Sequence, residues 1–291
     1  MMSKILVTGA TGSLGKQTVV ALSTKTDVKN IVALVRDESK AEDLKAMGVE
    51  LRVGNYDDVQ SLVSAFQGIG KLFFVSASEV EKRLPQHKNV MEAVVKSGVK
   101  HVVYTSFVRK NESDASPIAA VAKAHIFTDD FLLESGIGYT ILRNTLYMEF
   151  APYFMGDKVV ENGMVYLPSG EGKVSFLLRS EMAEIAARIL TSEGHKNKIY
   201  NLAAAEAFSY GDIARFLTKI TGKNIRFVSP PVDEFVQALK NAGLPDAAIG
   251  MSAGFAQAIE QGEFDITNPE ISELLGRKPV TLEEFLGKIY S

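Results

Sequence analysis

The stretch that decides the fold is KILVTGATGSLG, at residues 4–15. A short apolar run leads into three glycines, Gly9, Gly12 and Gly15, and apolar positions then recur at helical spacing. This pattern predicts a strand, a tight turn and a helix in direct succession. Because the first N–H groups of a helix have no partner within the helix and lie at its positive dipole end, such a turn is suited to bind a phosphate group.

The three glycines are expected to have different tasks in this turn. Gly9 permits the tight turn, Gly12 lets the backbone approach a pyrophosphate, and Gly15 lets the helix pack closely on the strand. The residues that we expect to contact the pyrophosphate are Gly9, Thr11, Gly12, Ser13, Leu14 and Gly15. The spacing is GxxGxxG rather than GxGxxG, and the alternative is an ordinary strand-helix turn that binds no ligand.

Strand-like and helix-like segments alternate from this turn to about residue 145. The strand-like segments are 30–36, 49–55, 71–78, 100–107 and 139–144, and the helix-like segments between them are 39–48, 57–68, 85–98 and 122–136. A parallel strand pair needs a crossover, usually a helix, to return the chain to the same end of the sheet. The sequence therefore predicts an α/β fold with a Rossmann-type, doubly wound parallel sheet.

After about residue 145 the order changes to short strand-like segments interspersed with helices. These segments are MVYLP at 164–168, VSFLL at 174–178, IYNLA at 199–203 and IRFVSP at 225–230. We predict an NAD(P)-binding Rossmann domain at 1–150 and a smaller C-terminal α+β substrate lobe at 151–291, over the carboxyl edge of the sheet. The boundary stays open, because a helix such as that at 180–192 is an alternative partner for the first domain.

Composition excludes several classes of function. The 291 residues contain no cysteine, which rules out disulfides, thiolate metal sites and iron-sulfur clusters. The formal net charge of −3 is not concentrated in charged blocks, so we expect no nucleic-acid partner. The sequence shows neither a membrane-spanning apolar run nor a signal peptide. We therefore expect a cytoplasmic protein with a small-molecule partner and no membrane contact, and a homodimer stays open.

The end of the second strand predicts which dinucleotide is bound. Arg36 stands where an NAD-specific protein places a carboxylate for the ribose hydroxyls. A guanidinium at this point pairs with the 2′-phosphate of NADP, and Lys40 is a second cation one turn onward. The alternatives are a solvated Arg36 and a ribose contact from Asp37. We predict NADP(H) as the cofactor.

The Tyr-x-x-x-Lys pair of ordinary short-chain dehydrogenases is missing. Its lysine lowers the tyrosine pKa so that the phenol exchanges a proton with the substrate. Tyr104 is followed four residues later by Val108, and Tyr139 by Arg143. This absence argues against a sugar-nucleotide epimerase or an alcohol dehydrogenase of the common type.

The whole chain resembles the NmrA-like atypical short-chain dehydrogenases/reductases, above all their NADPH:quinone oxidoreductase and triphenylmethane reductase branch. The likeness is carried by VTGATGSLG at 7–15, ALVRD at 33–37, SGVKHVVYTSF at 97–107, SGIGYTILRNTLYMEF at 135–150 and GRKPVTLEEFL at 276–286. The resemblance implies a bound NADPH and a cleft for flat aromatic or quinone-like molecules. It also implies that Asn55, Tyr56 and Asp57 lie near the adenine.

Two further strand ends carry candidate cofactor residues. Ser76, Ala77 and Ser78 follow one strand, and the hydroxyls of Tyr104 and Ser106 end the next. The carboxyl ends of the strands line the ligand crevice in a doubly wound sheet, so we expect these residues near the ribose and nicotinamide. Phe107 offers a stacking face to the substrate. The alternatives are a loop without a ligand and a buried, structural Tyr104.

Lys123 and His125 begin a helix two residues apart, so they cannot share one face and at most one of them faces the ligand. Lys123 is a candidate for the cofactor. The resemblance to isoflavone reductase-like proteins places His125 where those relatives carry a working lysine, which makes it the candidate catalytic residue. The alternative for His125 is a capped or exposed helix residue.

Substrate contacts are expected where the chain leaves the Rossmann domain. Asn144 offers a hydrogen bond, and Tyr147 and Phe150 offer the walls of an aromatic pocket, with hinge packing as the alternative. The remaining histidines show no metal-ligand spacing, so we expect no metal. They are His87, His101 and His195.

Two hypotheses of function follow. The first is an NADPH-dependent oxidoreductase that reduces quinones or similar conjugated aromatic acceptors. Such acceptors take hydride when they are merely stacked on the nicotinamide, so the missing Tyr-Lys pair is tolerated. The second is a non-catalytic, NADP(H)-sensing regulatory protein, since regulatory NmrA-like relatives bind the dinucleotide without turnover. A sugar-nucleotide epimerase is a third and weaker hypothesis.

Overall fold

The computed structural model describes residues 3–291, which form two compact units that are interleaved along the chain. The first unit comprises the described residues up to Phe107, Ala120–Asn144 and Arg179–Tyr200, and the second comprises Val108–Ala119, Thr145–Leu178 and Asn201–Ser291. A single division at residue 150 differs from these units in three segments, the shortest of which is 145–150, in the second unit. Residues 108–119 belong to the second unit, and residues 179–200 belong to the first.

The first unit is built on a seven-stranded sheet in the order β3-β2-β1-β4-β5-β6-β9. Its strands are β1 (Lys4–Val7), β2 (Ile31–Val35), β3 (Glu50–Val53), β4 (Ile69–Phe74), β5 (His101–Phe107), β6 (Gly138–Asn144) and β9 (Lys198–Leu202). The pairs from β3 through to β6 are all parallel. The order reverses at β1, as in the Rossmann fold, and confirms the predicted doubly wound sheet.

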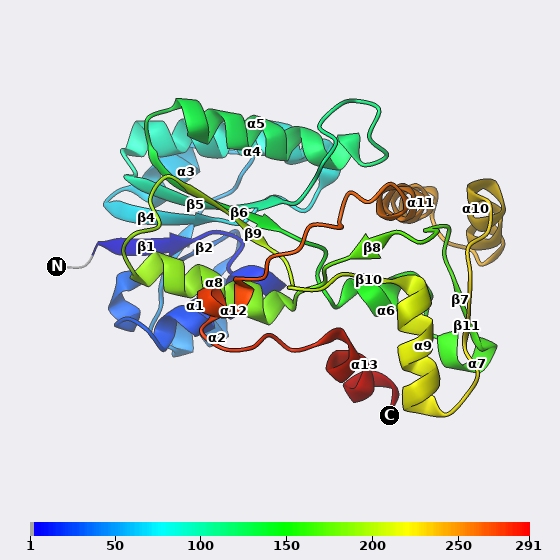
Figure 1. Cartoon of the computed structure of the whole chain (residues 1–291). Helices are drawn as coiled ribbons and strands as arrows, with labels where there is room; N and C mark the ends of the chain where they lie inside the picture. Colours follow the sequence, from blue (N-terminus) through cyan, green and yellow to red (C-terminus); the bar gives the residue numbers. More distant parts are fainter. Residues whose placement is uncertain (1–2) are drawn as a thin grey trace. The chain divides into compact units, whose positions relative to one another are not determined.

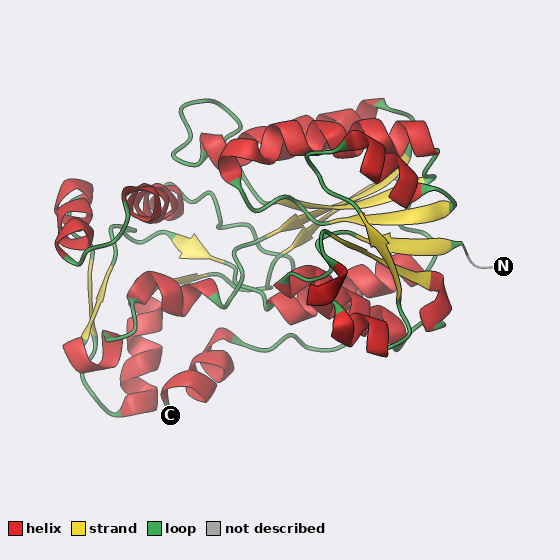
Figure 2. Ribbon diagram, turned by 180° about the vertical axis from the view of Figure 1, so that it is seen from behind, coloured by secondary structure: helices red, strands yellow, loops and turns green. Residues whose placement is uncertain are grey.

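Helices cover both faces of this sheet (Figures 1 and 2). They are α1 (Ser13–Ser23), α2 (Glu42–Ala46), α3 (Val59–Phe66), α4 (Val80–Ser97), α5 (Ala119–Glu134) and α8 (Arg179–Thr191). Figure 1 shows α3, α4 and α5 on one face and α1, α2 and α8 on the other. Because both faces are covered, the central strands are apolar without alternation, and all five residues of β2 are buried.

The core beside α3 and α4 contains large aromatic side chains. Phe66, Phe74 and Tyr104 are each fully buried there. Burying one such side chain contributes about 1.5–3 kcal/mol. The core therefore fixes the end of β4 and the end of β5, where the candidate site residues begin.

The second unit is a mixture of short strands and helices. Its strands are β7 (Met164–Tyr166), which pairs with β11 (Arg226–Val228), and β8 (Lys173–Val174), which pairs with β10 (Phe208–Ser209). Its helices are α6 (Phe150–Met155), α7 (Val159–Asn162), α9 (Tyr210–Thr221), α10 (Val232–Asn241), α11 (Asp246–Glu260), α12 (Ile271–Leu275) and α13 (Leu282–Tyr290). Within residues 3–291, no helix combines the length and apolarity that a membrane span needs.

Two of the short strands differ from the prediction. The segment 199–203 was expected in the lobe, but β9 is a strand of the central sheet beside β6. The segment 174–178 forms a strand only at its start, and Leu177 then makes an isolated bridge with Tyr147. Apolar periodicity detects a strand but does not identify its partner, which explains both differences.

Candidate functional site

The turn after β1, residues 9–15, has the geometry of a phosphate-binding turn and is named the phosphate turn below. Gly9 has a φ of +58°, in the left-handed region that favours glycine. A Cβ on Gly15 would lie 2.2 Å from the carbonyl oxygen of Gly9, which no side chain tolerates. A Cβ on Gly12 would meet the same oxygen at 3.2 Å, a contact that a small shift relieves. The fold therefore demands glycine at 9 and 15 more strictly than at 12.

Helix α1 begins at the phosphate turn without a side-chain cap. Gly12 is the N-cap residue, and its carbonyl accepts the first helical hydrogen bond, from Lys16 N–H at 2.9 Å. The N–H groups before this bond have no acceptor inside the helix, and the first turn carries no acidic residue. Thr11 and Ser13 beside them are exposed. The start of α1 thus presents N–H groups and a positive dipole end to an anion.

Arg179, the first residue of α8, also reaches the phosphate turn. Its guanidinium Nη1 donates to the hydroxyl of Ser13 at 3.1 Å. Helix α8 packs against α1 within the first unit, which explains how a residue so distant in sequence arrives there. The sequence analysis did not include Arg179, because nothing local marks it as part of the turn.

The residues after β2 place two cations at the neighbouring strand end. Arg36 and Lys40 are both exposed. Between them, Asp37 Oδ1 accepts hydrogen bonds from the Ser39 N–H at 3.0 Å and the Ser39 hydroxyl at 2.7 Å. These bonds hold the pKa of Asp37 below its usual value. Asp37 is thus a local capping residue, and the basic side chains beside it are the groups suited to a phosphate.

The residues after β3 divide into exposed and internal side chains. Asn55 and Asp57 are exposed, whereas the Tyr56 hydroxyl turns inward, donates to the Val75 carbonyl at 2.8 Å and is hydrogen-bonded to the hydroxyl of Thr8. Burial raises the pKa of Tyr56, so its phenol stays neutral. Tyr56 therefore ties the end of β1 to the end of β4. The expected adenine contacts of Asn55, Tyr56 and Asp57 stay a prediction.

Side chains hold the backbone of Ser76–Ser78, named the β4 loop below. Ser76 N–H donates to the hydroxyl of Thr105 at 2.9 Å, and Ala77 N–H donates to Nε2 of His87 at 3.1 Å. Arg83 donates to the carbonyl of Ala77 and, at 3.3 Å, to that of Ser78. The predicted cofactor residues of this loop thus have a fixed backbone.

Tyr104 and His125 form a buried pair beside this loop. The Tyr104 hydroxyl and His125 Nδ1 are 2.7 Å apart, and the two residues are 0% and 4% exposed. The Phe107 ring packs edge-on against the His125 ring, with centroids 5.0 Å apart. Lys123 is exposed, so the two candidates on α5 do point in different directions. His125 is the one that faces the end of β5.

The Ser106 hydroxyl points to a buried carboxylate. It donates to Asp129 Oδ2 at 3.1 Å, and Arg143 Nη2 contacts the same oxygen at 3.4 Å. At the end of β6, Asn144 is 5% exposed and its Oδ1 has no hydrogen-bond partner among residues 3–291. Buried polar atoms in proteins almost always have a partner, so Asn144 Oδ1 is suited to meet a ligand or a water molecule.

In the second unit, Tyr147 and Phe150 stack on each other with ring centroids 5.7 Å apart, and Phe150 is 36% exposed.

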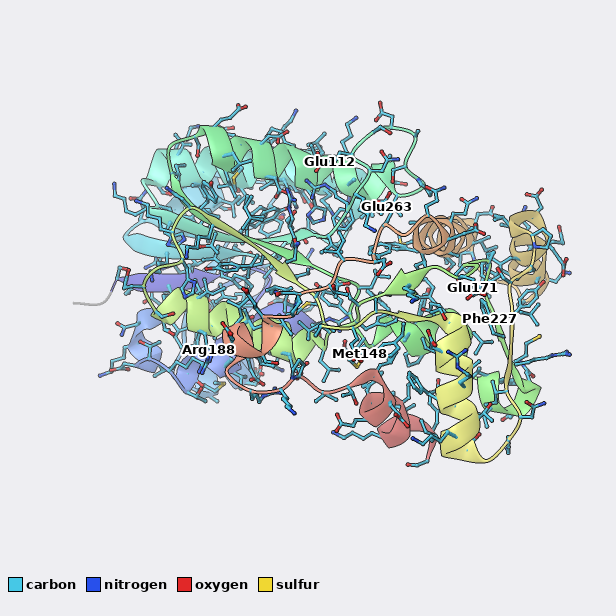
Figure 3. The ribbon with its side chains drawn as sticks, viewed as in Figure 1. Glu112, Met148, Glu171, Arg188, Phe227 and Glu263 are labelled. Atoms are coloured by element: carbon cyan, nitrogen blue, oxygen red, sulfur yellow. The ribbon has the colours of Figure 1, made fainter. Side chains whose placement is uncertain are left out.

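A buried carboxylate of the second unit, that of Glu263, follows α11 and is labelled in Figure 3. It accepts hydrogen bonds from the N–H groups of Lys110 and Asn111 at 2.7 and 2.9 Å. Glu263 thus fixes the start of the segment 108–119.

Comparison with known proteins assigns the family. The model of the NmrA-like family matches residues 1–286. The chain belongs to this family. Quinone oxidoreductase 2 of Escherichia coli is 36% identical over 99% of both chains. The solved structure of the NADPH-dependent quinone oxidoreductase of E. coli, complexed with NADPH, superposes with a TM-score of 0.89 at 36% identity and covers 99% of this chain and all of that one. The Citrobacter sp. triphenylmethane reductase complexed with NADP(H) gives 0.90 at 33% identity, with 99% and 100% covered.

In this NmrA-like protein the candidate cofactor residues of the first unit gather at one edge of one sheet. The phosphate turn, Arg36 and the β4 loop follow β1, β2 and β4, which are parallel neighbours, whereas Tyr104 lies in the middle of β5 and is fully buried. The sequence predicted these strand ends correctly because each lies directly after a recognisable strand. Three side chains that act on the site from elsewhere in the fold were not predicted: Arg83, His87 in its role at the loop, and Arg179.

Proposed function

We propose that this protein is an NADPH-dependent oxidoreductase that transfers hydride to quinones or similar conjugated aromatic acceptors. The observation that carries the proposal is the phosphate turn with cations on either side, Arg36 after β2 and Arg179 on Ser13. The full-length likeness to a quinone oxidoreductase and a triphenylmethane reductase supports the reductase activity.

The residues present fit NADPH. Gly12 and the start of α1 leave room for a pyrophosphate, which their N–H groups would bind together with Arg179. Arg36 and Lys40 would bind the 2′-phosphate, where each hydrogen bond to a charged group contributes about 1.5–3 kcal/mol. The β4 loop would lie against the nicotinamide half, whereas Tyr104 is fully buried and would act only through His125, which corrects its prediction as a direct cofactor contact. When bound, NADPH supplies the hydride.

The acceptor side of the reaction rests on His125 and Phe107. A quinone that receives hydride becomes an anion, and a neighbouring donor stabilises it and supplies a proton. When the Tyr104 O–H donates to Nδ1 of His125, the proton of the neutral imidazole sits on Nε2, which is then its donor. In that arrangement Tyr104 would select the tautomer of His125 that can donate a proton. Phe107 offers a ring face beside His125. The other predicted contacts of the acceptor are Asn144, Tyr147 and Phe150.

Steady-state oxidation of NADPH tests the proposal. We expect loss of NADPH absorbance with simple quinones and with aryl dyes, and slower oxidation of NADH. The Gly12→Val variant is the control, since it should fold but bind no dinucleotide. A wild-type protein that binds NADPH tightly and reduces none of these acceptors contradicts the proposal and favours an NADP(H) sensor, the hypothesis that the relatives do not favour.

The small-molecule acceptor is the only partner that this proposal needs. A homodimer and a cytoplasmic location stay predictions. Light scattering coupled to size-exclusion chromatography tests the first, and cell fractionation tests the second.

A further inference from the structure

Two buried side chains of α4 form hydrogen bonds with the backbone of the β4 loop. His87 is 0% exposed and Arg83 is 9% exposed. His87 Nε2 accepts the N–H of Ala77, and Arg83 donates to the carbonyls of Ala77 and Ser78. Three consecutive peptide groups of the loop are therefore anchored by these side chains rather than by a neighbouring strand.

The hydrogen bonds of His87 define a single tautomer. Because Nε2 accepts from Ala77, the proton of the ring is on Nδ1, which donates to the Thr128 hydroxyl at 2.9 Å. Thr128 in turn donates to the Ala124 carbonyl at 2.8 Å, where the chain of bonds ends. A proton on His87 thus has no route to a substrate through this chain. The role of the ring is geometric.

The same ring forms part of the wall around the buried pair of β5 and α5. The His87 ring packs edge-on against Phe74 and His125, with centroids 4.8 and 5.9 Å apart. Burial and the neighbouring Arg83 lower the pKa of His87 to about 3. His87 therefore stays neutral near pH 7 and adds no positive charge of its own beside His125.

We propose that His87 and Arg83 are positioning residues that fix the β4 loop against the nicotinamide of NADPH and thereby set the geometry of hydride transfer. The inference rests on the proposed function. Hydride transfer needs reacting atoms at near-attack distance, and a displacement of about 1 Å can cost about 10²-fold in rate. Hydrogen bonds to the Ala77 N–H and to the carbonyls of Ala77 and Ser78 fix the loop backbone, and a fixed loop restricts the movement of the nicotinamide. We expect the loop to contribute little to NADPH affinity, because the phosphates would be bound by the phosphate turn and Arg36.

The test compares His87→Leu, which keeps the bulk but accepts no hydrogen bond, with His87→Gln, whose amide oxygen is an acceptor. Arg83→Met and Arg83→Lys repeat the comparison at the second anchor. His101→Leu is the matched control, because His101 is a second histidine of low pKa, at the other end of β5 and bonded to Thr140. The measurements are kcat with a quinone, the NADPH dissociation constant, and the transfer of deuterium from NADPH labelled on either face of C4.

We expect His87→Leu and Arg83→Met to lower kcat about 10- to 100-fold and to change the NADPH dissociation constant by less than about 3-fold. We also expect some transfer from the wrong face of the nicotinamide. His87→Gln should restore most of the rate, and His101→Leu should keep it. Unchanged kcat and facial selectivity in the folded variants overturn the proposal. If His87→Leu does not fold, the Arg83 pair decides by the same criteria.

The fluorescence of bound NADPH separates this inference from the proposed function, because the emission comes from the reduced nicotinamide itself. If the wild type reduces no acceptor, the proposed function fails, but the emission of NADPH bound to wild type and His87→Leu still reports the position of the ring. A changed emission at an unchanged dissociation constant supports the proposal that His87 positions the nicotinamide. Identical emission overturns it.

Discussion

Mild acid is expected to destabilise the fold through His87. Its pKa in the folded protein is about 3, because of burial and the positive Arg83, whereas an unfolded histidine titrates near 6.5. The folded pKa lies below the unfolded one, so the unfolded chain takes up the proton first. The stability is therefore fully present above about pH 6.5 and is lost as the pH falls from there toward 3.

The size of this effect follows from the shift. Each pH unit between the two pKa values costs about 1.4 kcal/mol for one proton, so His87 accounts for about 2 kcal/mol at pH 5. This is a large fraction of the roughly 5–15 kcal/mol by which proteins are stable. His101 acts in the same direction, since burial, Lys71 and Lys196 lower its pKa to about 4. Carboxylates with lowered pKa values, such as Asp37, contribute only in stronger acid.

Urea unfolding of the wild type and of His87→Gln at about pH 7.5, 6.5 and 5 measures the effect. Glutamine keeps an acceptor for the Ala77 N–H but does not titrate. We expect the free energy of unfolding of the wild type to fall between pH 7.5 and 5 by about 2 kcal/mol more than that of the variant. Equal losses in the two proteins would show that His87 is not held neutral by the fold, and would refute the reasoning.

Four further predictions concern the cofactor and the reaction. Arg36→Ala should weaken NADPH binding by about 1.5–3 kcal/mol in a fluorescence titration and leave NADH binding unchanged, whereas equal wild-type affinities for the two cofactors would contradict the 2′-phosphate site. Arg179→Ala should weaken NADPH and NADH alike, about 3- to 10-fold, because the pyrophosphate is common to both and the guanidinium is partly exposed; an effect on NADPH alone would place Arg179 elsewhere. Gly12→Val should abolish dinucleotide binding and keep a native circular dichroism spectrum, while Gly15→Ala should lower the melting temperature, and unchanged binding by the first variant would move the site. His125→Ala should slow quinone reduction about 10²-fold with nearly unchanged NADPH affinity, and an unchanged rate would leave positioning alone as the mechanism.

The sequence predicts those parts of the site that a single local segment builds. The phosphate turn combines a strand end, a positive φ at Gly9 and a close approach at Gly15, and each of these demands leaves a glycine in one stretch. Arg36 and Ser76 are predicted as cofactor residues in the same way, because they lie directly after apolar runs. Periodicity also detects β9, but its place beside β6 depends on packing that no local pattern contains.

Contacts between distant segments are the part that the sequence does not predict. His87 has the same local sequence pattern as an ordinary amphipathic helix residue, and its bond to Ala77 arises only when α4 and β4 pack into the same core. Arg179 reaches Ser13 because α8 packs on α1, although the two residues are 166 positions apart. Such side chains carry no periodic signal, since one buried polar group on a helix resembles any other until its partner is known.

The order of the strands predicts the direction in which a dinucleotide lies. Arg36 follows β2, the phosphate turn follows β1, the β4 loop follows β4, and Phe107 ends β5, and these strands are neighbours in the order β2-β1-β4-β5. Neighbouring strands are about 4.8 Å apart, so the four strand ends span about 14 Å. A ligand with its 2′-phosphate at Arg36 and its pyrophosphate at α1 therefore has only one way to continue, across β4 toward β5. We expect that path to bring the nicotinamide to the loop that His87 and Arg83 anchor, so our proposal assigns cofactor choice and hydride transfer to opposite ends of the same sheet edge.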